Sequence, residues 1–159
     1  MEIKIREAVQ DDITSIKSLW TELFEFNAQK DYAFAINEYA EKQFKKLIKS
    51  LIIDSEGSKV LVAEVEGNIV GYMTASVSKK PPGFKLKKYG HILGASVAPE
   101  FRRKGIGTKL YLEIIAWFYS RGIDRIEVNA LTNNEISTSF WQKMGFVSYY
   151  QSYYLSKQD

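Results

Sequence analysis

The chain of 159 residues contains no cysteine and only one histidine, His91. Disulfides, thiolate metal ligands and a cysteine nucleophile are therefore excluded, and so is a site that needs several imidazole ligands. No run of about 18 apolar residues is present, so we expect no membrane-spanning helix, and the first residues lack the apolar segment of a secretory signal. We expect a cytoplasmic protein without a metal site, which works through oxygen and nitrogen side chains, backbone groups or a bound cofactor.

The sequence also lacks a strong excess of one charge. The net charge of +3 favours nucleic acid only weakly, although lysines and arginines gather in residues 79–88 and 102–104. Hydrophobic residues make up 45% of the chain and charged residues 26%, which is ordinary for a globular protein. The length fits one domain over residues 1–159.

Hydrophobic periodicity predicts helices and strands in a mixed order. Asp11 or Asp12 is placed to cap the first helix, and Gly67 and Asn68 are expected to form a two-residue hairpin turn, since both tolerate positive φ. The expected helices cover residues 13–24, 36–53, 107–121 and 134–144. The expected strands lie at residues 3–5, 60–65, 69–77, 91–97 and 125–130, with one or two more in 146–155, and 78–89 form a loop. This order indicates an α/β or α+β fold with a mostly antiparallel sheet.

The strongest local signal is a short basic loop with glycines, between an expected strand and an expected helix. It reads Arg102-Arg103-Lys104-Gly105-Ile106-Gly107-Thr108. The first turn of a helix leaves backbone N–H groups unpaired, and the helix dipole adds positive charge there, so a pyrophosphate binds well. Gly105 and Gly107 allow close approach of the main chain and unusual φ. A plain helix start with solvated arginines is the alternative.

Two other phosphate-binding loops fit this segment less well. The pattern G-x-x-x-x-G-K-[ST] of a P-loop is absent. A dinucleotide fingerprint has a third Gly or Ala where Leu110 stands, and it follows an early strand rather than one two-thirds along the chain.

Two motifs make the chain resemble the GNAT superfamily of acetyl-CoA-dependent N-acetyltransferases. Arg102, Gly105 and Gly107 match the family pattern [QR]-x-x-G-x-[GA]. Residues 134–146 look like the second motif, N-x-x-[AS]-x-x-[FL]-[YW]-x-x-x-G-F, and residues 5–8 are similar to family N-termini. The resemblance therefore covers nearly the whole chain.

The resemblance implies a GNAT fold, with a central mixed, mostly antiparallel sheet of six or seven strands, about four helices, and a V-shaped splay between strands 4 and 5. It implies an enzyme that moves an acetyl group from acetyl-CoA to a primary amine by direct attack in a ternary complex, without a metal. The acceptor is a small molecule or a protein amine, and no residue chooses between them. An acyl-CoA-binding module with little or no turnover is the alternative.

The resemblance also implies where acetyl-CoA binds. In the family, the pantetheine arm fills the splay like an extra strand, a backbone N–H there holds the oxyanion, and the pyrophosphate lies on the following loop. The implied binding residues are Ala95, Ser96 and Val97 in the strand, Arg102, Arg103, Lys104, Gly105, Ile106, Gly107 and Thr108 in the loop and helix start, and Asn134 at the start of the last helix.

The group that protonates the leaving thiolate is not assigned by the resemblance. Many family members carry a tyrosine where Trp141 stands, and an indole N–H does not ionise usefully. The thiolate then leaves without strong protonation, or water, Tyr149 or Tyr150 supplies the proton. The alternative for these two tyrosines is that their rings pack on the sheet.

The general base has several candidates. Glu127 is similar to a position that some members use for this purpose, and the alternative is a surface glutamate paired with Arg125 or a lysine. His91 has a suitable ordinary pKa, with a half-exposed structural histidine as its alternative. A water chain is the third candidate.

Other segments carry weaker signals. Residues 79–88 contact either the adenosine 3′-phosphate or an acidic partner, or form an exposed hairpin tip. Residues 27–34, with Asp31 and Tyr32, lie in the helix connection that helps to shape the family's acceptor site. Four aromatic residues at helical spacing are expected in the core: Trp20, Tyr111, Trp117 and Phe118.

Apart from the acceptor, the sequence suggests one partner, a second copy of the chain. The aromatic residues 149–155 are a candidate edge strand for a homodimer, because an apolar strand left at an edge favours association. We expect no membrane and no nucleic-acid partner. A nucleic-acid binder acting through the two basic segments is a further alternative, and it would show a steep salt dependence of binding.

Overall fold

The computed structural model describes residues 1–157, and its contacts group the chain into two compact units. The first unit comprises residues 1–129, and the second begins at Ala130.

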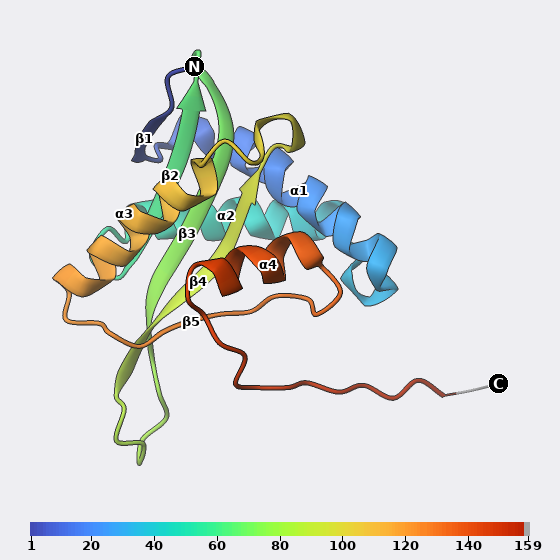
Figure 1. Cartoon of the computed structure of the whole chain (residues 1–159), viewed down its shortest axis with the longest axis vertical. Helices are drawn as coiled ribbons and strands as arrows, with labels where there is room; N and C mark the ends of the chain where they lie inside the picture. The colour runs from blue at the N-terminus through green and yellow to red at the C-terminus, as the bar shows by residue number, and fades with distance from the viewer. Residues whose placement is uncertain (158–159) are drawn as a thin grey trace. The chain divides into compact units, whose positions relative to one another are not determined.

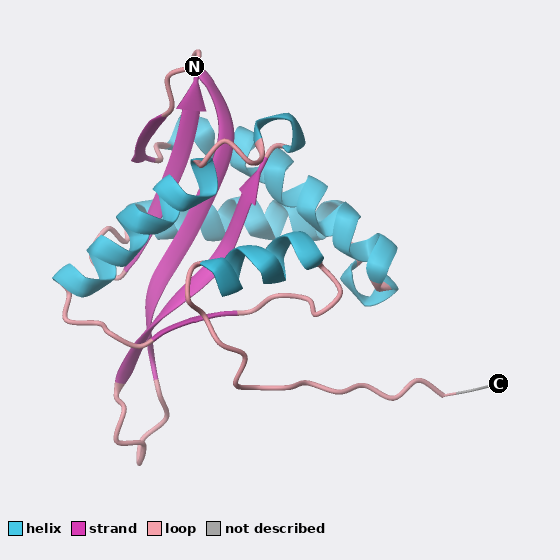
Figure 2. Cartoon of the chain, viewed as in Figure 1, coloured by secondary structure: helices cyan, strands magenta, loops and turns pink. Residues whose placement is uncertain are grey.

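A five-stranded sheet forms the centre of the first unit, in the order β1-β2-β3-β4-β5 within the described residues. The strands are β1 (Lys4–Glu7), β2 (Ser58–Val65), β3 (Asn68–Lys79), β4 (Lys88–Val97) and β5 (Ile126–Val128). Neighbours from β1 to β4 pair antiparallel, whereas β5 pairs with β4 in parallel (Figure 2). The predicted mixed, mostly antiparallel sheet in an α/β fold is confirmed.

Helices cover both faces of this sheet. Figure 1 shows α1 (Ile13–Lys30) and α2 (Glu38–Ile53) on one face and α3 (Ile106–Ser120) on the other. Ile16, Ile48 and Tyr72 are fully buried in the core beneath α1 and α2. On the other face, a Cβ on Gly90 would meet the ring of Phe118 at 2.6 Å. Helix α3 therefore packs directly against the main chain of β4.

The second unit contains α4 (Glu135–Lys143). Asn134 caps its N-terminus by accepting a hydrogen bond from the Ser137 N–H at 3.2 Å. The Trp141 ring packs against Phe140 and Phe146, with centroid distances of 4.9 and 5.3 Å. With α4, the described part of the chain has the four α-helices that the sequence predicts, besides the 3-10 helices η1 (Gln10–Asp12), η2 (Tyr32–Phe34) and η3 (Pro99–Phe101).

Two predictions about strands and turns are wrong. No strand forms in residues 146–157, so the sheet of the described residues has five strands instead of six or seven. Aromatic residues favour a strand only where a neighbouring strand pairs with them. The β2–β3 turn lies one residue earlier than expected, at Glu66 and Gly67 with φ of 48° and 78°. Asn68 instead pairs with Val65.

Asp12 stands at the N-cap of α1, but its carboxylate does not cap that helix. It accepts hydrogen bonds from the Val9 N–H at 2.8 Å and from the Arg6 guanidinium at 2.7 and 2.9 Å. The carboxylate therefore ties β1 to the start of the helix. The hydrogen bond from Arg6 lowers the pKa of Asp12, although burial opposes this shift.

Candidate functional site

The candidate site begins where β4 and β5 separate. The two strands pair at three positions, the last of which joins Ile92 to Val128, whereas β4 continues beside β3 to Val97. Leu93, the next residue, is an extra residue in the β3–β4 ladder and forms a bulge. A bulge bends its strand and increases the local twist. The predicted splay between strands 4 and 5 thus begins at Leu93.

The bulge changes which residues of β4 face β3. Before it, Gly90 donates its N–H to the Arg125 carbonyl, next to β5, at 2.8 Å. Beyond it, Ala98 donates its N–H to the Val70 carbonyl, next to β3, at 2.8 Å. Gly90 and Ala98 are an even number of residues apart, so in a regular strand their N–H groups would point to the same side. The extra residue reverses this.

Ala95 and Val97 consequently present backbone groups at the open edge of β4. Alternate residues of a strand direct N–H and C=O to the same side, so Ser96 shares the direction of Ala98 toward β3. Ala95 and Val97 point the opposite way, to the side that β5 has left. Among the three strand residues implied by the resemblance, Ser96 is the one whose backbone belongs to the β3 ladder.

Arg102 fixes the loop that follows β4. Its Nε donates a hydrogen bond to the Val97 carbonyl at 3.0 Å, which holds the loop against the end of the strand. Lys104 places its Nζ 5.1 Å from the centroid of the Phe101 ring, whereas Arg103 is exposed. Two of the three basic side chains therefore have local contacts within the loop region.

Left-handed residues shape the loop before α3. Arg103 has a φ of 62°, and Gly105, the N-cap of α3, has a φ of 80°. A left-handed conformation costs a non-glycine residue about 1 to 2 kcal/mol, so the tight path of the loop is strained at Arg103. A Cβ on Gly105 would meet no atom within 4 Å. Backbone conformation, not crowding within the chain, therefore explains the glycine.

The first turn of α3 has several backbone N–H groups that point in the same direction and have no partner within the helix. The first intrahelical bond runs from the Lys109 N–H to the Gly105 carbonyl at 3.0 Å. The N–H groups of Ile106, Gly107 and Thr108 precede that bond and have no partner inside the helix, and Gly105 has no side chain that could accept from them. This arrangement, at the positive end of the helix dipole, has the donors and the polarity that favour an anion.

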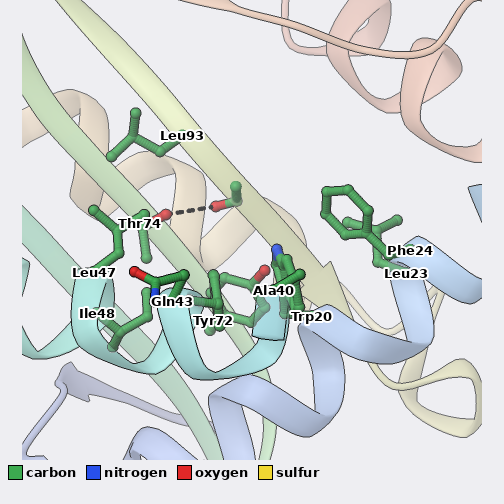
Figure 3. Close-up of a pocket in the computed structure, with 12 residues that line it drawn as sticks. Trp20, Leu23, Phe24, Ala40, Gln43, Leu47, Ile48, Tyr72, Thr74 and Leu93 are labelled. Carbon is green, nitrogen blue, oxygen red and sulfur yellow. Dashed lines mark hydrogen bonds between the residues drawn. The ribbon is translucent and has the colours of Figure 1, made fainter. Parts of the chain in front are cut away.

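A groove lies beside the bulge, on the sheet face covered by α1 and α2. It has a volume of about 470 Å³, within the range of small-molecule sites. Figure 3 shows its walls: Trp20 and Phe24 from α1, Leu47 from α2, Tyr72 from β3 and Leu93 from β4. The described residues that line it include no charged side chain.

Tyr72 places a polar atom in this apolar groove. Its hydroxyl is buried and has no hydrogen-bond partner within the described chain. Burial raises the pKa of Tyr72 well above its ordinary value, so the group is a neutral hydroxyl at physiological pH. A Cβ on Gly94 would lie 3.4 Å from the hydroxyl oxygen, which places the hydroxyl next to the bulge of β4.

Glu127 of β5 lies opposite His91 of β4 in the sheet register. Its Oε1 lies 3.2 Å from the Arg125 Nε and 3.6 Å from the Lys80 Nζ. The structure thus contains the ion pairs of the alternative interpretation, and Lys80 connects the loop of residues 80–87 to the sheet. Burial lowers the pKa of His91, and the charge of Glu127 partly offsets this shift.

Some predicted candidates lie away from the groove or in the second unit. Asp31 caps η2 through a 3.0 Å bond from the Ala33 N–H, and Tyr32 is 86% exposed; neither lines the groove. Tyr149 and Tyr150 belong to the second unit, where they are exposed and in no strand.

The aromatic residues predicted to be core fall into two groups. Trp117 and Phe118 are buried, as expected, whereas Trp20 and Tyr111 are half-buried. Trp20 stacks on Phe44 with a centroid distance of 4.3 Å and also forms a wall of the groove. Sequence analysis missed Tyr72 and Leu93 as lining residues, because their spacing is that of ordinary strand residues. The one available signal was Gly94, since a glycine inside a strand is typical of a bulge.

The structure brings most of the predicted coenzyme-binding residues into one continuous segment of the first unit. Ala95 to Val97 end β4, and Arg102 to Thr108 form the loop and the first turn of α3. Asn134 is buried at the start of α4 in the second unit. Within residues 1–157, no group of three His, Cys, Asp or Glu side chains is arranged to hold a metal ion. No helix of the same residues is long and apolar enough to cross a membrane.

Comparison of the sequence with known proteins gives consistent matches. The model of the acetyltransferase (GNAT) family matches residues 13–146. An uncharacterized N-acetyltransferase from Archaeoglobus fulgidus is 31% identical over 119 residues, which cover 75% of this chain and 76% of that protein. Three further N-acetyltransferase relatives are 26–28% identical, and the chain spans 57–63% of their length.

Solved structures share the fold. A tetramutant of the BH1408 protein from Bacillus halodurans superposes with a TM-score of 0.86 at 23% identity, covering 97% of this chain and 99% of that one. AAC(6')-Iy in complex with the bisubstrate analogue CoA-S-monomethyl-acetylneamine superposes with a TM-score of 0.75 at 17% identity, with 100% of both chains covered.

Proposed function

This chain belongs to the acetyltransferase (GNAT) family and is an acyltransferase of the N-acetyltransferase type, and we propose that it transfers an acetyl group from acetyl-CoA to a primary amine. The observation that carries this proposal is the uncapped start of α3, with its free first-turn N–H groups, directly after the edge of β4 that β5 leaves unpaired. One substrate with a diphosphate and an extended amide-bearing arm matches both features at once.

The diphosphate of acetyl-CoA is proposed to bind to the loop and first turn from Arg102 to Thr108. The N–H groups of Ile106, Gly107 and Thr108 would donate to its oxygens. Gly107 supports this assignment because it lies in a helix without the positive φ that would require glycine. Glycine there costs the helix about 1 kcal/mol relative to alanine, and the missing side chain leaves room for a phosphate.

The pantetheine arm is proposed to lie along the open edge of β4. Its amides would pair with the backbone groups of Ala95 and Val97, as an added strand does. The Val97 carbonyl already accepts from Arg102, so Ala95 and the Val97 N–H remain for the arm. The Ala95 N–H, next to the bulge, is the donor that would stabilise the oxyanion as the thioester carbonyl is attacked.

The acceptor amine is proposed to enter through the groove and to attack the thioester directly. The amine nitrogen bonds to the acetyl carbon, the carbon–sulfur bond breaks, and coenzyme A leaves as its thiolate. Glu127 is the proposed general base, acting through water. A Cβ on Gly90 would face α3. Side chains alternate along a strand, so His91 and its register partner Glu127 face the other side of the sheet, where the groove lies. His91 precedes Leu93 by two residues, or roughly 7 Å along the strand.

The second unit contributes Asn134 to this proposal, as a contact to the arm of the coenzyme. We propose that both units act as one N-acetyltransferase domain, because the family match runs across their boundary. We also propose that the chain forms a homodimer through residues 149–155. Tyr153, Tyr154 and Leu155 are 84, 83 and 97% exposed, which is unusual for side chains of a stable monomer.

Two valine substitutions test the coenzyme site. Gly107→Val adds a branched side chain to the first turn of α3, where the diphosphate is proposed to bind, and Gly105→Val opposes the left-handed φ of the N-cap. We expect acetyl-CoA to bind at least tenfold more weakly to each folded variant, measured by calorimetry. Gly122→Val is the matched control, because Gly122 also has a positive φ, of 71°, with no atom within 4 Å of its Cβ position, and lies past the other end of α3. Unchanged affinity in the two test variants would refute the site.

Thiol release separates the enzyme from an acyl-CoA-binding module. An enzyme releases coenzyme A faster when an amine is added. A module binds acetyl-CoA tightly without amine-dependent thiol.

A further inference from the structure

The groove beside β4 has a composition that discriminates between acceptor amines. The described side chains on its walls are aromatic, aliphatic or neutral polar. A polycationic acceptor, such as a polyamine or an aminoglycoside, would bring extra ammonium groups into these walls. An unpaired charge is costly to remove from water, and the walls supply no carboxylate to compensate it. An apolar group, in contrast, gains free energy there in proportion to the area it buries.

Tyr72 adds a second, independent observation. Its hydroxyl is buried among the groove residues without a partner in the described chain. A buried polar atom that lacks a hydrogen bond costs about 1 to 3 kcal/mol, so a ligand that supplies the bond binds more tightly. Thr74 differs, because its Oγ1 already donates to the Gly94 carbonyl at 3.3 Å, the dashed line in Figure 3. Tyr72 is therefore the groove hydroxyl that still has a hydrogen bond to form, once a ligand at the groove wall reaches it.

The groove also ends next to the proposed reaction centre in the chain. Leu93 and Gly94 line it, and the next residue, Ala95, begins the part of β4 that faces the splay. The Tyr72 hydroxyl lies at this end, beside Gly94. A molecule whose apolar group fills the groove would therefore present its polar end to the hydroxyl and to the acetyl group.

We propose that the groove selects a primary amine that carries one bulky uncharged substituent, aliphatic or aromatic, and that Tyr72 hydrogen-bonds to a polar atom at the reacting end of that acceptor. This proposal rests on the proposed transferase function and narrows it to a class of acceptor. Free hydrophobic amines and the first residue of a peptide both have this chemistry, a primary amine next to an apolar side chain.

An acceptor panel tests the selection. Phenethylamine and leucinamide represent the apolar class, a peptide beginning with leucine represents the second source, and spermidine and neamine represent polycations. We expect kcat/KM from thiol release to be at least tenfold higher for the apolar amines than for both polycations. A polycation that equals or exceeds them would overturn the proposal. A peptide that surpasses leucinamide would identify peptide N-termini as the source.

Two substitutions locate the selection in the groove. Leu47→Glu adds a carboxylate to its wall at a residue that is 45% exposed, so folding is little affected. We expect kcat/KM to fall at least tenfold for phenethylamine and to rise for spermidine. Ile53→Glu, at a 65% exposed position of the same helix outside the groove, should change neither value. Equal effects of both substitutions would refute the groove as the acceptor site.

Tyr72→Phe tests the hydroxyl. Because the hydroxyl has no partner to lose, we expect the variant to fold normally, to keep its KM for acetyl-CoA, and to raise KM for leucinamide roughly five- to tenfold. Tyr39→Phe, on the exposed surface of α2, is the control. An unchanged KM for leucinamide in Tyr72→Phe would refute the role of the hydroxyl.

Binding measurements separate failure of this inference from failure of the proposed function. If acetyl-CoA binds but no amine releases thiol, the transferase proposal fails. The groove is then still tested by NMR titration of phenethylamine into the coenzyme A complex. Binding that Leu47→Glu abolishes supports the apolar site, whereas no binding, or binding that Leu47→Glu leaves intact, overturns it.

Discussion

The carboxylate of Asp12 connects the first strand of the sheet to the first helix. It accepts hydrogen bonds from Arg6 in β1 and from the Val9 N–H. Arg6 also donates to Glu64 of β2 at 2.8 Å. Asp12 is buried, so the pair is little screened by water. The side chain that sequence reasoning assigns to a helix cap is therefore part of an ion-pair network that orients α1.

Asp12→Asn keeps the shape of the side chain and removes its charge. We expect the free energy of unfolding at pH 7 to fall by about 1.5 to 3 kcal/mol, the value typical of hydrogen bonds to charged groups. The pKa of Asp12 is lowered by Arg6 in the folded state. The stabilisation is thus complete above the unfolded pKa, about 3.9, and is lost as the pH falls through the folded pKa. Urea unfolding should show the difference between the two proteins narrowing below pH 4; a constant difference would contradict this assignment.

Glu127 has two roles that one substitution separates. As the general base, its loss should lower kcat roughly 100-fold, in the range for such groups, and change the rate–pH profile while KM for acetyl-CoA stays constant. As a partner of Arg125 and Lys80 only, its loss should affect stability and leave the profile unchanged. Glu127→Gln decides between them, with Glu113→Gln on the exposed surface of α3 as control.

At the scale of elements, the bulge in β4 connects the fold to the proposed chemistry. One extra residue, Leu93, bends the strand at the point where pairing with β5 ends. The same residue shifts the alternation, so Ala95 and Val97 rather than Ser96 face the gap. Both effects come from a single position. In residues 93–97, the bulge therefore determines which backbone groups pair with β3, and the alternation of apolar and polar side chains does not.

Arg102 provides the connection from this strand to the loop. Removing its side chain by Arg102→Ala leaves the Val97 carbonyl without its 3.0 Å donor and releases the loop. We expect KM for acetyl-CoA to rise about tenfold, the equivalent of roughly 1.4 kcal/mol. Arg121→Ala is matched to it, because Arg121 also donates to a backbone carbonyl, that of Ser55 at 3.3 Å, and directly follows the far end of α3. Equal changes in both variants would contradict a local role.

Sequence patterns predicted the elements that depend on local signals. The helices and the first four strands follow hydrophobic periodicity, and the loop before α3 follows from its glycines. The turn at Glu66 was missed because a glutamate with a φ of 48° is set by strand pairing, not by its own preference. The groove was missed because its walls come from two helices and two strands, and contacts between distant segments leave no periodic trace.

At the scale of the whole molecule, residues 149–155 are the main disagreement between sequence pattern and structure. Their aromatic composition is typical of a strand, yet they form none, and Tyr150 and Tyr154 are 77 and 83% exposed. A strand needs a neighbour that supplies its backbone hydrogen bonds. A second copy of the chain offers an edge strand of the same sheet, and two copies related by a twofold axis satisfy both segments at once.

Truncation after Ser148 tests this assembly. We expect the full chain to sediment as a dimer at micromolar concentration and the truncated chain to sediment as a monomer, because the exposed rings supply the apolar area that association buries. The double variant Tyr150→Ser and Tyr154→Ser keeps the backbone and should weaken the dimer in the same direction. A full chain that remains monomeric at 100 μM, a concentration that corresponds to ~5.5 kcal/mol of association free energy, would contradict the dimer.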